Sequence, residues 1–259
     1  MPICALCLND VAQLRQSHII PEFFYKRIYD DKHRFQVFSH RKNGPIMRVQ
    51  QNGLREDLLC PACECLLSGW EGYTTRALFG GLELSSRDCG DYMEYTGLDY
   101  AKFKLFQMSM LWRMGLASKP GFDNVKLGAR HLERLRSMLY ASDPGEPFEY
   151  GCWMAAISSE IKTLSQVLFA PTATPRKVQG HTCYRAVLGG VFWCYFVSSH
   201  LDQFPLQMMF LSKDGSLRVW KESSYAKRFI QEFITEVHDA SVEYLKQSIQ
   251  GEIDRPTVV

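Results

Sequence analysis

Two pairs of cysteines constrain the fold of this chain more than any other feature of its sequence. Cys4 and Cys7 form one C-x-x-C unit, Cys60 and Cys63 form another, and fifty-two residues separate the two units. Each unit is a knuckle whose tight turn directs two thiolates at one point, and two knuckles complete a tetrahedral zinc site. Cys65 is close enough in sequence to replace Cys63, although its spacing from Cys60 suits a knuckle less well. The sequence therefore predicts a structural zinc ion held by four sulfur atoms.

The alternatives for these cysteines are disulfide bonds, a redox dithiol and unrelated turns. The chain has nine cysteines, an odd number that fits a closed disulfide framework poorly. It shows no secretory signal and no run of eighteen apolar residues, so we expect a cytoplasmic protein without a membrane partner, in which thiols stay reduced. A redox C-x-x-C normally opens a helix after a strand, and Cys4 is too near the N-terminus for that arrangement. Metal ligation remains the best explanation of the paired cysteines.

The hydrophobic patterning predicts an α+β protein. Alternating residues around a KNGP turn predict a β-hairpin between residues 26 and 55. Apolar residues at spacings of three and four predict helices within residues 98–140, interrupted at PGFDN. Segments rich in β-branched and aromatic residues, LQMMFLS (206–212) among them, predict a small antiparallel sheet after residue 148. A last helix is expected to begin at Ser223 or Ser224, where a serine can cap it.

The total charge does not mark the chain as a nucleic-acid-binding protein. Its formal net charge is only +2, so any contact with a polyanion requires a local basic patch. The segment from Pro21 to Arg55 is such a patch, because it carries eight lysines or arginines against three acidic residues. A solvated loop would show the same excess, and the sequence leaves both explanations open.

The order of motifs in the first 75 residues or so resembles that of the zinc-knuckle HNH endonucleases. A C-x-x-C unit is followed by His-Ile-Ile-Pro (18–21), then by the expected hairpin, then by a Leu-Cys-x-x-Cys unit that opens a helix. The resemblance implies a treble-clef fold carrying a ββα-metal active site. It covers under a third of the chain, and the rest resembles no known fold. Together with the hydrophobic patterning of the rest, it gives three predicted domains: a zinc-binding HNH-like domain over residues 1–80, a helical region over 81–147, and the sheet with the last helix over 148–259. The third is expected to bind a substrate or a partner.

The resemblance assigns roles to individual residues. His18 matches the family's first-strand histidine, a general base that takes a proton from the attacking water and is largely neutral near pH 7. The family's middle asparagine, which orients that imidazole, is matched best by Asn52. A Mg²⁺ or Mn²⁺ ion would offset the charge that develops on the scissile phosphate. Backbone phosphates would be held, without reading of the base sequence, by Arg34, Arg41, Lys42 and Arg48.

The chain departs from the family at two positions. Ser17 stands where many members have an acidic residue before the histidine, and Glu64 stands where the helix would supply Asn or His. Glu64 and Glu71 are seven residues apart, so on a helix their side chains return to nearly the same face. Two carboxylates on one face suit Mg²⁺ or Mn²⁺. The simpler alternatives are that both glutamates are solvated and that His18 is a structural histidine.

The resemblance implies a metal-dependent endonuclease that hydrolyses phosphodiester bonds in DNA. Such small nucleases often serve in bacterial defence against phage. A non-catalytic, zinc-stabilised module that binds nucleic acid or protein is the alternative. A third hypothesis is that the chain is a subunit of a larger complex and docks on a partner such as an ATPase. The sequence does not set the oligomeric state.

Overall fold

The computed structural model describes residues 1–26, 29–41, 44–119, 122, 125–156, 168–221 and 235. Within these ranges the chain is a mixed α+β protein, as the patterning predicts. Its helices are α1 (Glu22–Tyr25), α2 (Pro61–Phe79), α3 (Tyr100–Leu116), α4 (Ala129–Tyr140) and the short 3-10 helix η1 (Gln207–Met209). Its strands are β1 (Arg15–His18), β2 (Arg34–Arg41), β3 (Gly44–Gln51), β4 (Arg55–Leu59), β5 (Ser85–Asp88), β6 (Tyr92–Thr96), β7 (Cys152–Ala156), β8 (Leu168–Val178), β9 (His181–Leu188), β10 (Val191–Phe196) and β11 (Leu217–Trp220).

The strands form two sheets. In the described part of the chain, one sheet has nine strands in the order β3-β2-β8-β9-β10-β7-β11-β6-β5, and the other is the antiparallel ribbon β1-β4. The prediction of a small, antiparallel sheet after residue 148 is therefore wrong, because the sheet has more strands and includes parallel pairs. Strand β2 pairs in parallel with β8, and β11 pairs in parallel with β7. The sheet is larger because hairpins from the first hundred residues extend it at both edges.

Most of the predicted elements are present. The expected hairpin is β2–β3, and the expected helices are α3 and α4. The strand expected at LQMMFLS (206–212) is wrong, because its middle is the 3-10 helix η1. Pro205 precedes this segment and has no N–H for a sheet ladder, and the consecutive residues Met209, Phe210 and Leu211 are all buried rather than alternating. The helix expected from Ser223 or Ser224 falls outside the described residues, apart from Thr235.

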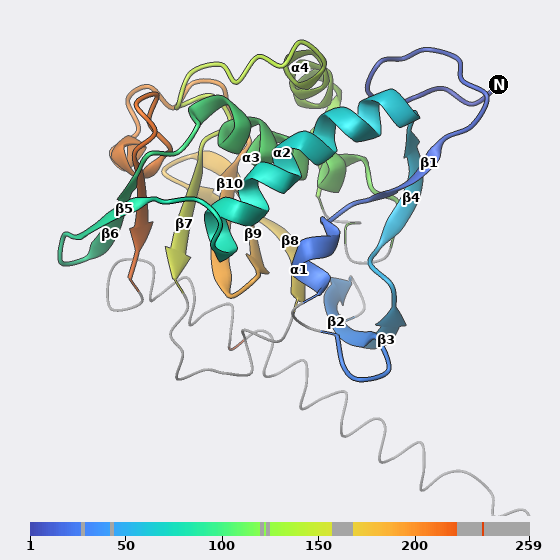
Figure 1. Ribbon diagram of the computed structural model, residues 1–259, viewed down its shortest axis with the longest axis horizontal. Helices are drawn as coiled ribbons and strands as arrows, with labels where there is room; N and C mark the ends of the chain where they lie inside the picture. The colour runs from blue at the N-terminus through green and yellow to red at the C-terminus, as the bar shows by residue number, and fades with distance from the viewer. Residues whose placement is uncertain are drawn as a thin grey trace, which may run out of the picture.

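Helices α2 and α3 lie across one face of the nine-stranded sheet, and the β1-β4 ribbon stands at the opposite end of the molecule from β5 and β6 (Figure 1). Every residue of α3 from Phe103 to Met114 is buried, so α3 is a central core helix rather than an amphipathic surface helix. The rings of Phe24, Phe106 and Trp193 pack together with centroids 6.1 to 6.4 Å apart. These contacts join α1, α3 and β10 in one core.

The core draws on all three predicted parts of the chain. One cluster of buried apolar residues includes members from the N-terminal segment, from α2 and α3, and from the strands after residue 150. The boundaries expected near residues 80 and 147 stay predictions. None of the helices in the described ranges combines the length and the apolar character needed to cross a bilayer.

Candidate metal centre and the adjoining histidine site

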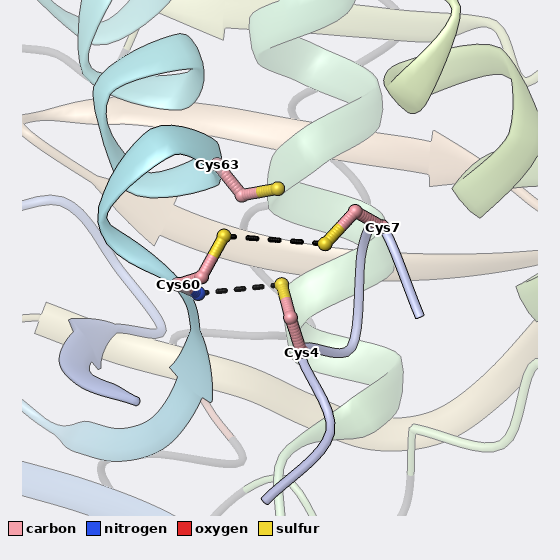
Figure 2. Close-up of side chains that lie close together, drawn as sticks. All are labelled: Cys4, Cys7, Cys60 and Cys63. Carbon is pink, nitrogen blue, oxygen red and sulfur yellow. Dashed lines mark hydrogen bonds between the residues drawn. The ribbon is translucent and has the colours of Figure 1, made fainter. Parts of the chain in front are cut away.

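The four paired cysteines lie together. All four sulfur atoms are within 4.8 Å of one another, and Cys7 Sγ lies 3.9 Å from Cys60 Sγ. Figure 2 shows Cys4 and Cys7 on the N-terminal loop facing Cys60 and Cys63 at the start of α2. In a tetrahedral site with Zn–S bonds of about 2.3 Å, neighbouring sulfur atoms are about 3.8 Å apart. The observed separation fits that geometry and is far longer than the roughly 2.05 Å of a disulfide. The group could therefore bind a metal ion such as zinc.

Local backbone structure sets the direction of the four cysteine side chains. The amide of Leu8 donates to the carbonyl of Cys4 at 2.9 Å, and this closes the first knuckle. On the other side, Cys60 is the N-cap of α2, and Pro61 begins the helix, where its missing N–H is not needed. One turn later Cys63 returns to the same face, whereas Cys65 is exposed and does not belong to the group. Cys63, and not Cys65, is therefore the cysteine that lies with the other three.

Close packing makes the thiols of this group oppose one another's ionisation. Burial opposes ionisation of Cys4, but hydrogen bonds from the backbone of Cys7, Cys60 and Leu6 outweigh it and lower the pKa of Cys4 to about 7. Burial and the neighbouring sulfur atoms raise the pKa of Cys63 well above its ordinary value. Because a thiolate at one position disfavours thiolates at the others, a divalent cation is the natural counter-charge for this group.

The N-terminal loop that carries Cys4 and Cys7 is tied to two further parts of the fold. The amide of Ala5 donates to the carbonyl of Leu58 at 2.9 Å, which joins the first knuckle to the end of β4. The guanidinium of Arg136 on α4 donates to the carbonyl of Leu6 at 2.7 Å. The N-terminal loop is therefore held by β4 and α4 as well as by the sulfur group.

His18 ends strand β1 and lies opposite Arg55 of β4. Its side chain is 18% exposed, and its Nε2 lies 2.7 Å from Glu22 Oε2 and 2.8 Å from Arg55 Nε. Burial and the positive charge of Arg55 lower the pKa of His18, and the carboxylate of Glu22 offsets part of that effect. The imidazole is therefore neutral at neutral pH, which is the form that can accept a proton.

Ser17 and Glu64, the two positions where the sequence departs from the expected pattern, touch each other. The hydroxyl of the fully buried Ser17 donates to Glu64 Oε2 at 2.5 Å. This bond joins β1, the strand of His18, to the first turn of α2, the helix that begins at Cys60 and carries Cys63.

The structure does not bring Glu64 and Glu71 together as a metal site. Glu71 Oε1 lies 2.7 Å from the guanidinium of Arg113, an almost fully buried side chain on α3. Among the described residues, the four cysteines are the single group of three or more side chains placed to hold a metal ion. A divalent ion shared by the two glutamates does not fit this arrangement, because one carboxylate is already neutralised by an arginine.

Of the remaining predicted site residues, those that the structure describes make no hydrogen bond or ion pair with His18, and the others lie outside the description. Asn52 is exposed in the loop after β3, with a φ of 63° that asparagine tolerates. Its neighbour Gly53 is the residue that packs on the histidine, since a Cβ there would lie 2.8 Å from His18 Cδ2.

Arg34, the first of the predicted phosphate-binding residues, forms a 2.8 Å ion pair with Asp30. Of the other basic residues, Lys42 and the side chains of Arg41 and Arg48 lie outside the described residues.

Sequence reasoning missed three residues that contact His18. Glu22 could have been noticed because it lies four residues after His18, although the intervening proline hides a helical relationship. Arg113 could have been noticed as a charge within an apolar helical stripe; it donates to the carbonyl of His18 at 2.8 Å. The third residue, Arg55, is placed by the register of β1 against β4, which the sequence does not reveal.

Comparison with known proteins found no matching family model, no similar protein of curated function and no similar solved structure. The function is therefore argued from the site.

Proposed function

We propose that this chain is an HNH-like endonuclease that hydrolyses phosphodiester bonds in nucleic acid, with DNA as the expected substrate. The observation that carries the proposal is the place of His18. A neutral, partly exposed imidazole ends β1, which pairs with β4, and β4 leads directly into α2 at the four-cysteine group. This order of two antiparallel strands and a helix supports the treble-clef and ββα-metal interpretation of the motifs.

In this proposal the two kinds of metal have separate tasks. Zinc at the four cysteines is structural, because a closed shell of four thiolates leaves no position for substrate. It would hold the N-terminal loop, which leads into β1, against the start of α2. Glu64 would contribute a carboxylate to a Mg²⁺ or Mn²⁺ ion, which would offset charge on the phosphate when bound. Glu71 has no part in holding this ion, because Arg113 already balances its charge.

The chemistry of the chain's own residues is proton removal and phosphate binding. His18 would take a proton from water, since water near pH 7 is a poor nucleophile towards a phosphodiester. The basic hairpin β2–β3 would hold the phosphate backbone through Arg34, Arg41, Lys42 and Arg48, and a phosphate at Arg34 would have to replace Asp30. A role in defence against phage is the biological context that the resemblance implies.

A second candidate function is a non-catalytic, zinc-stabilised module that binds nucleic acid or protein, including a subunit that docks on a partner such as an ATPase. The observation that favours it is the engagement of the candidate active-site groups. Nε2 of His18 contacts both Glu22 and Arg55, and Glu71 is paired with Arg113. In this non-catalytic alternative, the contacts of His18 and Glu71 stabilise the fold and have no part in a reaction.

The test is cleavage of supercoiled plasmid DNA, and of single-stranded RNA, in Mg²⁺ or Mn²⁺. Wild-type protein is compared with His18→Ala, Glu64→Gln and the control Glu83→Gln, which removes an exposed carboxylate between α2 and β5. Metal-dependent cleavage that is lost in His18→Ala and Glu64→Gln but kept in Glu83→Gln supports the nuclease. Wild-type protein that contains zinc and retards DNA in a gel, yet leaves it uncut, supports the binding module instead.

A further inference from the structure

Arg55 occupies the lone pair of His18. The two residues are partners in the register of the β1-β4 ribbon, and Arg55 Nε donates to His18 Nε2 at 2.8 Å. A ring nitrogen accepts such a bond only while it carries no proton, so the neutral imidazole has its proton at Nδ1 and its lone pair at Nε2. In this state the lone pair is bonded to a guanidinium and is closed to water.

Glu22 lies beside the same ring nitrogen and lacks a donor there. Its Oε2 is 2.7 Å from His18 Nε2, but no hydrogen bond joins two atoms that both lack a proton. Oε2 is buried and has no hydrogen-bond partner among the described residues, whereas Oε1 accepts from the Tyr29 hydroxyl at 3.3 Å. A buried carboxylate oxygen without a donor is unfavourable, so a proton added at Nε2 would supply the bond that Oε2 lacks.

The two neighbours of Nε2 therefore respond to a proton in opposite ways. Protonated Nε2 can donate to Glu22 but can no longer accept from Arg55. Within the described ranges Arg55 makes no other hydrogen bond, and its Nη2 is 3.7 Å from Glu22 Oε2, which is too far for one. Its side chain is 40% exposed, so the guanidinium is free to bind a group from solution.

The group that a guanidinium binds best is an anion with paired oxygen acceptors. Its N–H groups form a rigid fork that matches two phosphate oxygens at once, and such charge-assisted bonds are stronger than a bond to a neutral imidazole. A phosphate that approaches the exposed side of Arg55 therefore competes directly with His18 Nε2 for the guanidinium.

The charges around the imidazole admit this anion. Arg113 donates to the His18 carbonyl, but its charge is already balanced by Glu71. Arg55 and a protonated His18 would then supply two positive charges against the single carboxylate of Glu22. The titratable side chains around the ring are Glu22 and Tyr25 from α1, Arg55 from β4 and Arg113 from α3.

We propose that Arg55 and His18 form a binding site for a phosphodiester anion, in which the guanidinium leaves His18 Nε2 for the phosphate oxygens and Glu22 accepts from Nε2 once it is protonated. Arg55 is not among the four basic residues that the sequence assigned to the phosphate backbone. The binding site follows from the contacts alone. Its catalytic consequence rests on the proposed nuclease function, because a phosphate that removes Arg55 from Nε2 frees the base beside that phosphate.

The proton balance of the catalytic step is as follows. With Arg55 on the phosphate, Nε2 takes one proton from a water molecule. The hydroxide forms a bond to phosphorus as the bond to the leaving ester oxygen breaks, and the leaving oxygen takes a proton from solvent. The imidazolium donates through Nε2 to Glu22 Oε2, the oxygen that had no donor before.

The test is the binding of dimethyl phosphate, a simple phosphodiester anion, to histidine-labelled full-length protein, followed in the nitrogen NMR spectrum above the pKa of His18. The His18 signals are assigned from a His18→Gln variant. Wild-type protein is expected to show an unprotonated Nε2 and a protonated Nδ1, and the anion should move the Nε2 signal towards that of a nitrogen without a donor. Arg55→Gln should weaken binding at least about tenfold.

The matched control is Arg87→Gln. It removes the same charge from an exposed arginine on β5, at the opposite end of the molecule from the β1-β4 ribbon (Figure 1). This variant should bind dimethyl phosphate as the wild-type protein does. An anion response of His18 that survives in Arg55→Gln, or that is lost equally in Arg87→Gln, overturns the site.

The pH dependence tests the part of Glu22. The anion should raise the pKa of His18, because it offsets the positive charge of Arg55 that lowers this pKa. By reciprocity, dimethyl phosphate should bind more tightly as the pH falls through the pKa of His18. Glu22→Gln should lower the pKa of His18, since the carboxylate raises it. An unchanged pKa in Glu22→Gln would contradict its role as the acceptor.

Cleavage assays separate this site from the nuclease function. If the protein cleaves DNA or RNA, Arg55→Gln should lose roughly 10²-fold in kcat/KM, and undiminished cleavage overturns the catalytic part of Arg55. Binding that depends on Arg55, in a protein that cuts neither DNA nor RNA, upholds the anion site and contradicts the nuclease function. Circular dichroism of each variant shows that a changed response does not come from unfolding.

Discussion

Arg113 and Glu71 form an ion pair with a separation of 2.7 Å that joins α3 to α2. The arginine side chain is 2% exposed, and the same Nη1 atom also donates to the backbone carbonyl of His18 at 2.8 Å. One buried guanidinium thus positions the histidine strand and the cysteine helix relative to the core. This explains why a charged residue stands in the middle of a helix that is buried on all sides.

Replacing Arg113 by leucine is expected to destabilise the protein by about 3 kcal/mol, because it leaves the Glu71 carboxylate and the His18 carbonyl without their donor. The Glu71 side chain is 21% exposed, so water can still solvate its carboxylate, and the loss of stability should lie at the lower end of the range for a broken buried ion pair. Urea denaturation measures the change. The double variant Arg113→Leu/Glu71→Leu should lose less than the sum of the single variants, by about 1–3 kcal/mol. Simple additivity would show that the two side chains are not coupled.

Replacing each of two glycines by alanine should change the stability of the protein in opposite directions. A Cβ at Gly53 would lie 2.6 Å from the Tyr25 ring and 2.8 Å from His18 Cδ2, so Gly53→Ala is expected to cost about 1–3 kcal/mol. Gly69, inside α2, has nothing within 4 Å of such a Cβ, and Gly69→Ala should stabilise the protein by up to about 1 kcal/mol. Thermal unfolding of both variants checks the contrast, and a neutral Gly53→Ala would argue against close packing on the histidine.

Lys104 should make stability depend on alkaline pH. It is buried in α3, where its ammonium donates to the carbonyls of Pro147 and Tyr150. Burial lowers the pKa of Lys104 from 10.5 to about 8, while Cys152 and Glu149 oppose that shift. Between pH 8 and 10.5 the unfolded chain binds the proton and the folded chain does not, so this contribution to stability rises with pH.

The comparison variant is Lys104→Met, which removes the titrating group. The free energy of unfolding of the wild-type protein, minus that of Lys104→Met, should increase by about 2 kcal/mol from pH 8 to pH 10. Taking the difference removes the titration of other groups that the two proteins share. A difference that stays flat over this interval would mean that the folded state leaves the pKa of Lys104 unchanged.

The features that the sequence predicted correctly are local ones. A C-x-x-C turn fixes the direction of its own two thiolates, so the group of Cys4, Cys7, Cys60 and Cys63 could be read from spacing. The stripe in α3 and the β2–β3 hairpin follow from periods of 3.6 and 2 in the same way. The site around the imidazole was predicted less well. Its contacts depend on which helix and which strand pack beside it, and spacing in the sequence does not encode that.

Two particular errors illustrate this limit. Glu64 and Glu71 do share a helix, but an arginine forty-two residues further along the chain pairs with one of them. The nine-stranded sheet includes β2 because that strand pairs in parallel with β8, from a part of the chain more than a hundred residues away. Alternation identifies strands but does not identify their partners.

The most direct test of the account is the zinc content of the purified chain and of two single variants, measured by elemental analysis. We predict one zinc ion per wild-type chain. Cys63→Ser should lose that zinc and unfold at a lower temperature. Cys65→Ser, whose exposed side chain lies outside the group, should keep the zinc and the wild-type unfolding temperature. A wild-type chain without metal, or a zinc ion that depends on Cys65 and not on Cys63, would contradict it.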